Sequence, residues 1–233
     1  METSKKISLA DKIYLTIKKA IVNRELPPGT KLPEEVLASS LNASRTPIRS
    51  ALQRLSYEKL VDISPRKGAS VSSPSVKEVK EVFEMRALLE EFTVEKACMN
   101  YRKSPRVSET LEHILKVEEE AYRNKDVSEV LVQVRNFHLE IAKLCGNDLI
   151  VRHLEELILL TNLYITFFSE LDINSPNSPQ EHIRILKAIQ SGDAETAKRE
   201  LQSHIAGIVS RLNFHLIGNP DLNLRDILLK NSV

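Results

Sequence analysis

The stretch "SRTPIR", Ser44 to Arg49, places a polar residue, two arginines and a proline directly before an apolar run. Serine is favoured at a helix N-cap and proline is tolerated in the first turn. These residues therefore predict a helix that begins here, with the Ser44 side chain accepting a hydrogen bond from a first-turn amide. Arg45 and Arg49 are four residues apart and share one face of this helix. The helix dipole disfavours cations at this end, which indicates an anionic partner outside the protein.

The residues before this stretch predict two further helices. Apolar residues four apart, from Leu9 to Ile21, form one face of an amphipathic first helix. The Pro-Pro-Gly turn in residues 26–32 ends it. The segment "PEEVLASSL" (33–41) predicts a short second helix with an acidic first turn. About three residues separate it from the third helix, which we expect over about 45–59.

A small hairpin is expected after the third helix. The segment "LVDISPRKGASVSS" (60–73) alternates apolar and polar residues around a basic tip that contains Arg66 and Lys67. Three helices followed by a hairpin make a winged helix-turn-helix. We therefore assign residues 1–72 to a DNA-binding domain of this class.

The charge distribution agrees with a polyanionic partner for this first domain. Residues 1–75 contain 13 Lys or Arg and 7 Asp or Glu, a net charge of +6, whereas residues 76–233 contain 20 and 25, a net charge of −5. In a helix-turn-helix the N-terminal residues of the third helix enter the major groove, where arginine pairs with guanine. The wing tip would meet the DNA backbone or the minor groove. We predict double-stranded DNA as the partner; the alternative is an ordinary helix with solvated arginines.

The remainder of the chain predicts an all-α antiparallel bundle. A polar linker, assigned to residues 73–77, precedes it, and residues 78–218 show helical periodicity without strand-like alternation. The expected helices cover about 76–99, 107–123, 127–144, 148–168, 178–190 and 194–216. The tail, residues 219–233, allows one short helix or none. The predicted fold class is mainly α, a winged helix-turn-helix followed by a helical bundle.

Composition narrows the class of protein. No apolar run is long enough to span a membrane, and "METSKKIS" carries positive charge without a following apolar region, so neither a membrane segment nor a secretory signal is expected. Cys98 and Cys145 lack metal-type spacing and are expected to be reduced core thiols. A cytoplasmic location follows from these expectations.

Three histidines, His138, His182 and His204, fall on three separate predicted helices. Imidazole is a common ligand of transition metals, and three imidazoles plus an open position suit zinc or nickel. The alternative is three unrelated hydrogen-bonded core or surface residues. The other histidines match no motif, and "EEE" at residues 118–120 is expected to be a solvated helix end.

The first domain resembles the GntR transcriptional regulators. The resemblance rests on "PPGTKLPEEVLA", "SRTPIRSAL" and the spacing of Leu52, Leu55, Leu60 and Val61. It implies a winged helix that binds a palindromic operator as a homodimer. Some members place a basic residue where Glu35 stands here, and a carboxylate does not favour phosphate, so that contact is not assigned. The residues assigned to DNA binding are Ser44, Arg45, Thr46, Arg49, Arg66, Lys67 and Gly68.

The second domain resembles the FCD ligand-binding domain of the FadR-like GntR subfamily. The resemblance rests on "FH" followed by "GN", on "EHIRILKAIQSGD" and on "SHI". It implies a metal held by the three histidines and by an aspartate four residues before His138, but Val134 stands there. A three-histidine site, substitution by Asn136 or another residue, and weakened binding all stay open. Arg86 matches an arginine near the effector pocket; the alternative is an ion pair with Glu90.

The predicted function is a metabolite-responsive transcriptional regulator and not an enzyme. We expect a repressor whose bundle dimerises and binds a small organic acid beside zinc or nickel. One alternative is a metal-free lipid, acyl or protein-interaction sensor, which Val134 favours. The other is a three-histidine metalloenzyme tethered to DNA, for which no spacing singles out a general base. The sequence does not specify the operator, the regulated genes, the effector or the metal.

Overall fold

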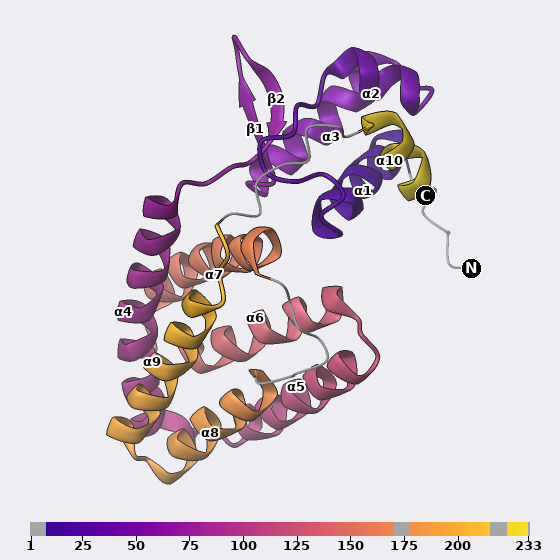
Figure 1. Ribbon diagram of the computed structural model, residues 1–233. Helices are drawn as coiled ribbons and strands as arrows, with labels where there is room; N and C mark the ends of the chain where they lie inside the picture. The colour runs from indigo at the N-terminus through magenta and orange to yellow at the C-terminus, as the bar shows by residue number, and fades with distance from the viewer. Residues whose placement is uncertain (1–7, 170–177, 215–222, 233) are drawn as a thin grey trace, which may run out of the picture. The chain divides into compact units, whose positions relative to one another are not determined.

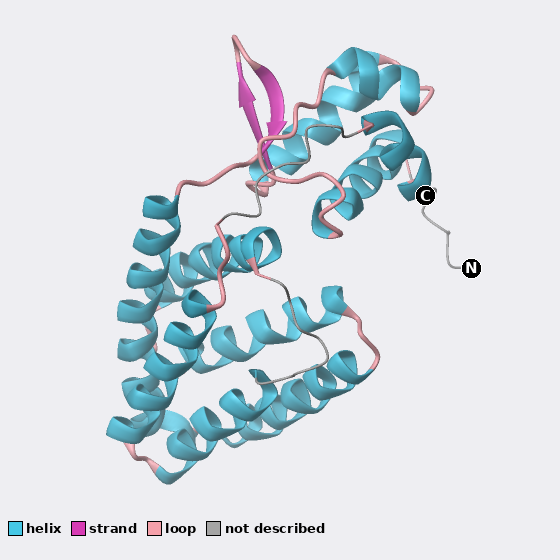
Figure 2. Ribbon diagram, viewed as in Figure 1, coloured by secondary structure: helices cyan, strands magenta, loops and turns pink. Residues whose placement is uncertain are grey.

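The computed structural model describes residues 8–169, 178–214 and 223–232 (Figure 1). The predicted fold class is confirmed: the chain is mainly helical, and its only β-sheet within the described ranges has two strands (Figure 2). Contacts divide the chain into two compact units between Ser75 and Val76. Residues 166–168, 214 and 223–232 group with the first unit.

The first unit contains the predicted helix-turn-helix. Its three helices are α1 (Leu9–Val22), α2 (Glu34–Ser40) and α3 (Arg45–Tyr57). Ser8 and Asp11 form a capping box that starts α1. The turn between α2 and α3 has four residues, and Asn42 adopts a left-handed conformation in it (φ 47°) that asparagine tolerates well. The apolar faces of α1 and α3 pack together and bury Ile13, Ile17, Ile21, Ile48, Leu52 and Leu55.

The wing is an antiparallel hairpin of β1 (Val61–Ser64) and β2 (Gly68–Val71). Val61 pairs with Val71 and Ser64 with Gly68, so the tip holds Arg66 and Lys67 as expected. Gly68 has a φ of +72°, which favours glycine at the end of this turn. Residues 29–32 pair with the other edge of β2 through Lys31 and Ser70 and anchor the wing to the segment before α2.

The second unit is a bundle of long helices. They are α4 (Val76–Asn100), α5 (Pro105–Arg123), α6 (Val127–Lys143), α7 (Asp148–Phe168), α8 (Ser178–Ser191) and α9 (Ala194–Ser210), with a short 3-10 turn η1 (Tyr101–Lys103) after α4. Asp126, Asn147 and Asp193 cap α6, α7 and α9 by accepting hydrogen bonds from first-turn amides. The helix α9 ends at Ser210, earlier than the predicted end near residue 216, and part of that extension lies outside the described residues.

Within the bundle, α4 packs against α9, α6 and α8, and α5 packs against α6 and α8. In Figure 1, α4 and α9 run side by side. Cys98 and Cys145 are free thiols but half-buried, so the expectation that they belong to the core was wrong. His113 and His153 are exposed, and His215 lies outside the described residues.

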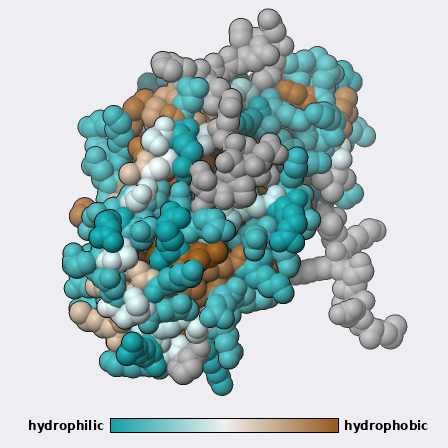
Figure 3. Space-filling view, turned by 60° about the horizontal axis from the view of Figure 1, so that its bottom comes forward, coloured by the Kyte–Doolittle hydropathy of each residue, from teal (hydrophilic) through white to brown (hydrophobic). Residues whose placement is uncertain are grey.

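On the face shown in Figure 3, hydrophobic side chains gather near the centre and are bordered by hydrophilic ones. None of the described helices is both long enough and apolar enough to cross a membrane. Several large apolar side chains of α4 are exposed, among them Met85, Leu88 and Phe92.

The short helix that the tail allowed is present as α10 (Leu224–Asn231). It packs against α1 and α2 and therefore groups with the first unit. From the sequence, residues 219–233 were assigned to a separate tail. Leu228 is fully buried in this contact. Lys230 Nζ lies 2.6 Å from Glu25 Oε1, and the Asn231 amide also donates to the Glu25 carboxylate.

Removing the buried side chain of α10 should destabilise the first unit. Because Leu228 is fully buried, we expect Leu228→Ala to lower the free energy of unfolding by roughly 2–5 kcal/mol. The neighbouring Leu229 is 53% exposed, so Leu229→Ala should cost less than about 0.5 kcal/mol. Urea unfolding measures the free energy of unfolding of each variant, and hydrogen exchange of the α1 amides measures how well α1 is protected in each. Equal protection of α1 in the two variants would contradict the docking of α10.

Candidate metal centre and DNA-binding face

The structure brings the three predicted histidines together in the bundle. His138 comes from α6, His182 from α8 and His204 from α9, and none is more than 3% exposed. One ring nitrogen from each lies within 4.8 Å of a ring nitrogen of the other two. The three histidines therefore form one cluster and are not scattered over the bundle, while the geometry alone does not decide between a metal site and hydrogen-bonded core residues.

Each imidazole has one nitrogen beside a carboxylate oxygen. His138 Nδ1 lies 3.1 Å from Glu90 Oε2, and His204 Nδ1 lies 2.6 Å from Glu181 Oε2. His182 Nδ1 lies 2.8 Å from Glu118 Oε2. A carboxylate accepts, so in the hydrogen-bonded pairs of His182 and His204 the Nδ1 atom carries the proton and Nε2 presents a lone pair. The contact of His138 with Glu90 is at ion-pair distance but is not a hydrogen bond. All three Nε2 atoms are buried and have no hydrogen-bond partner within the described ranges.

Glu118 was wrongly predicted to be solvated. Its side chain is fully buried, and Ser178 Oγ also donates to it at 3.0 Å, while Glu119 and Glu120 are exposed. A signal was present in the sequence, because Glu118 follows the buried Leu111 and Leu115 at helical spacing on the apolar face of α5. A carboxylate in that stripe requires a buried cationic or hydrogen-bonding partner.

Arg86 belongs to the same polar network. Its side chain is fully buried, its Nε donates to Glu90 Oε1 at 2.8 Å, and its Nη1 donates to Thr161 Oγ1 at 2.7 Å. The predicted alternative, an ion pair with Glu90, is therefore present, but it is buried rather than exposed. Its Nη2 is buried without a hydrogen-bond partner among the described residues. Through Glu90, the guanidinium is connected to His138.

Burial controls the protonation of the cluster. It lowers the pKa of His138 to about 4 and of His204 to about 3, although Glu90 and Glu181 partly oppose this. Burial also tends to raise the pKa of Glu90, but the charges of Arg86 and His138 outweigh it and hold that pKa well below its usual range. Burial also tends to raise the pKa of Glu181, but the hydrogen bond from His204 and the nearby positive charges together lower it. Near neutral pH, His138 and His204 are thus neutral imidazoles beside the ionised carboxylates of Glu90 and Glu181.

Val134 is buried in a small apolar cluster with Ala121, Tyr122 and Val130. It supplies no ligand, and among the His, Cys, Asp and Glu side chains of the described residues the three imidazoles are the group placed to hold an ion. In a tetrahedral zinc site with bonds of about 2 Å, ligand nitrogens lie about 3.3 Å apart. Each imidazole places one ring nitrogen within 4.8 Å of the others, and its Nε2 has no hydrogen-bond partner among the described residues, so the cluster fits such an ion after an inward movement of the rings.

The residues assigned to DNA binding lie on the exposed face of the first unit. All seven are exposed: Ser44, Arg45, Thr46, Arg49, Arg66, Lys67 and Gly68. Ser44 occupies the N-cap of α3 as predicted, but its side chain makes no capping hydrogen bond. Pro47 occupies the third helical position and has no N–H, so it removes one of the two amides that an N-cap side chain can accept from.

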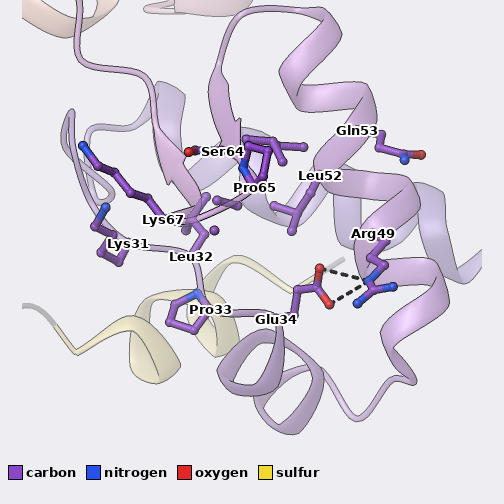
Figure 4. Close-up of a pocket in the computed structure, with 13 residues that line it drawn as sticks. Lys31, Leu32, Pro33, Glu34, Arg49, Leu52, Gln53, Ser64, Pro65 and Lys67 are labelled. Carbon is purple, nitrogen blue, oxygen red and sulfur yellow. Dashed lines mark hydrogen bonds and ion pairs between the residues drawn. The ribbon is translucent and has the colours of Figure 1, made fainter.

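The two arginines of α3 have anionic partners inside the protein. Glu34 and Glu35 form the acidic first turn of α2. Arg49 Nε lies 3.0 and 2.8 Å from the two carboxylate oxygens of Glu34 (Figure 4), and Arg45 Nη2 lies 2.8 Å from Glu35 Oε1. These arginines are therefore neither simply solvated nor dependent on an outside anion for all of their partners.

Comparison with known families agrees with both halves of this description. Residues 9–71 match the bacterial regulatory proteins of the gntR family, and residues 81–207 match the FCD domain. The HTH-type transcriptional regulator YdhC of Bacillus subtilis is 27% identical over 195 residues, which is 82% of this chain and 85% of that protein. The transcriptional repressor RspR of Escherichia coli is 24% identical over 197 residues, 84% of this chain and 85% of that protein.

Solved structures show the same fold. A GntR-type regulator from Rhodococcus sp. RHA1 matches with a TM-score of 0.65 at 21% identity, covering 86% of this chain and 95% of that chain. McbR/YncC of E. coli matches with a TM-score of 0.60 at 21% identity, covering 88% and 98%. The chain belongs to the GntR family of bacterial transcriptional regulators and carries an FCD domain; these relatives are regulators and not enzymes.

The carboxylates behind the imidazoles should tune metal affinity. Glu118→Gln keeps the side-chain shape but removes the charge beside His182, so we expect zinc affinity to fall about 10- to 100-fold. Glu119→Gln removes the same charge from the adjacent, exposed position and is the matched control. Competition with a chromophoric chelator measures both. Equal zinc affinity in the two variants would show that the Glu118 carboxylate does not contribute to metal binding.

The lowered pKa values predict a pH dependence of stability. Imidazoles of an unfolded chain titrate near 6.5, whereas those of His138 and His204 titrate at about 4 and about 3 in the fold. The unfolded chain therefore binds more protons between these values, so the free energy of unfolding should fall as the pH is lowered from about 6.5 to about 4. Urea unfolding of chelator-treated protein measures this slope. The slope should become shallower in His204→Gln and stay unchanged in the control His153→Gln. If the stability of the wild-type protein did not change over this pH range, the two rings would not be buried in their neutral form.

Proposed function

We propose that this chain is a metabolite-responsive repressor that binds a palindromic operator as a homodimer. The relatives named as repressors include RspR and the gluconate operon repressor of B. subtilis, which is 30% identical over 138 residues, 59% of this chain and 56% of that protein. The winged helix supplies the DNA-binding surface, and the bundle supplies the sensor. A DNA-binding regulator of this kind acts in the bacterial cytoplasm, beside its operator.

The proposed sensor holds a divalent transition metal, zinc or nickel, at His138, His182 and His204. The single observation that carries this proposal is the set of three buried Nε2 atoms without hydrogen-bond partners within the described ranges. A bound ion would supply a Lewis acid with open coordination positions. Glu90, Glu118 and Glu181 would keep the three rings in the tautomer that leaves Nε2 free to bind.

The proposed effector is a small organic acid. A carboxylate suits the open positions of a three-imidazole centre, and the unpartnered Nη2 of Arg86 offers a second cationic group in the same network. The rest of the Arg86 guanidinium is already bound to Glu90 and Thr161, so we propose one contact from this arginine rather than a paired grip.

A metal-free sensor bundle is the second candidate. The apolar burial of Val134 favours it, because the position that the resemblance assigns to an aspartate supplies no charge here. This version leaves three buried ring nitrogens without partners, a cost that a metal would remove. The metal-bound sensor is therefore the better supported of the two.

The proposed dimer rests on exposed apolar side chains of α4. Met85, Leu88 and Phe92 are 50%, 70% and 41% exposed, and their spacing places them on one face of the helix. An apolar stripe of this kind is typical of a surface that a partner covers. A two-fold dimer would present two copies of α3 to two half-sites, which is why we propose a palindromic operator.

The DNA-binding assignment is tested on duplexes selected from a random pool by the wild-type protein. Arg45→Ala and Arg49→Ala should each cost roughly 1–3 kcal/mol in specific binding, because they remove base contacts. Lys67→Ala should weaken binding to all DNA sequences, because it removes a phosphate contact. The slope of the logarithm of the binding constant against the logarithm of the salt concentration should decrease in magnitude by about one. Arg152→Ala, an exposed arginine of the bundle, is the control. Unchanged affinity in both α3 variants would show that α3 does not read DNA.

A further inference from the structure

The ion pairs between α2 and α3 differ in their geometry. Glu34 contacts Arg49 Nε with both carboxylate oxygens, and its side chain is only 32% exposed. Glu35 contacts Arg45 with a single oxygen, and its side chain is 78% exposed. In the first pair, both carboxylate oxygens of a half-buried glutamate contact the arginine. The second pair is a solvent-exposed surface contact that stabilises the protein little.

The contact from Glu34 leaves the base-reading end of Arg49 available. Both contacts are made by Nε, and no partner of Nη1 or Nη2 occurs within the described part of the chain. Paired recognition of guanine O6 and N7 uses a rigid fork of N–H groups. A carboxylate behind the fork limits the rotamers of this long side chain, so less conformational freedom is lost when Arg49 meets a base.

The surroundings of Glu34 are basic. Figure 4 shows Glu34 and Arg49 pointing toward one another at a groove that Lys31 and Lys67 also line. These lysines attract phosphate whatever the base sequence. The Glu34 carboxylate is the opposing charge at this groove, and it disfavours complexes that are held by phosphate contacts alone.

We infer that Glu34 determines DNA specificity by positioning Arg49 for a base edge and by weakening sequence-independent binding at the groove. This inference rests on the proposed role of α3 in reading DNA and adds to it a residue of α2. Glu34 is a positioning residue that need not touch a base.

The test compares two variants with the same charge change, Glu34→Gln and Glu35→Gln. Full-length wild-type and variant proteins are titrated with a duplex selected by the wild type and with a scrambled duplex of equal length and composition. We expect the ratio of the two affinities to fall about fivefold or more in Glu34→Gln, the factor that corresponds to about 1 kcal/mol, with tighter binding of the scrambled duplex. In Glu35→Gln the ratio should change by less than about twofold.

Two results would overturn the inference and leave the proposed function intact. One is an unchanged ratio in Glu34→Gln while Arg49→Ala loses discrimination. The other is an equal loss in both glutamine variants, which would reflect net charge alone. If Arg49→Ala also keeps the wild-type ratio, the assignment of α3 as the reading helix fails, and the role of Glu34 fails with it. Thermal melting of each variant confirms that the fold is retained.

Discussion

Three imidazole–carboxylate pairs, two fully buried and one with a partly exposed carboxylate at Glu181, constrain most helices of the bundle. An ionised carboxylate in an apolar interior is costly unless it is paired and hydrogen-bonded. Here the carboxylates come from α4, α5 and α8, and the rings come from α6, α8 and α9. Five helices must therefore hold their register for the pairs to form. The helical packing that buries the apolar faces also orients three ring nitrogens toward one point.

The same physical device recurs at the DNA-binding face. In the bundle, a carboxylate behind each ring fixes a tautomer and leaves the opposite nitrogen available. On α3, the carboxylate of Glu34 lies behind Arg49 and leaves the terminal nitrogens available. In both places the proposed role of the acidic residue is to orient the group that binds the ligand, without contacting the ligand itself. The pairs of the bundle are mostly shielded from solvent, whereas the surface pair is screened and correspondingly weaker.

Much of this arrangement follows from the sequence, because periodicity and turn chemistry are local. Apolar residues four apart predict α1, and the basic tip between Ser64 and Gly68 predicts the wing. Other features depend on tertiary neighbours. The side chain of Ser44 makes no capping hydrogen bond although its sequence position suits one, and Glu118 is buried where His182 from a distant helix faces it.

The C-terminal helix α10 shows a similar limit. Its short amphipathic pattern allows a helix, but the identity of its docking surface depends on the residues of α1 and α2 that cover Leu228. Arg86 is a further case, since the spacing to Glu90 predicts the ion pair while only the fold shows that it is buried beside the histidine cluster. Long-range polar partners are therefore the part that the sequence alone leaves open.

The most direct test of the central claim is metal analysis of the protein purified without a histidine tag, alongside the double variant His138→Ala, His182→Ala. The three-imidazole centre predicts about one zinc or nickel per chain in the wild type and none in the variant, with helical content retained in both. Wild-type protein that stays free of metal after incubation with zinc would contradict it, and the bundle would then be a metal-free sensor.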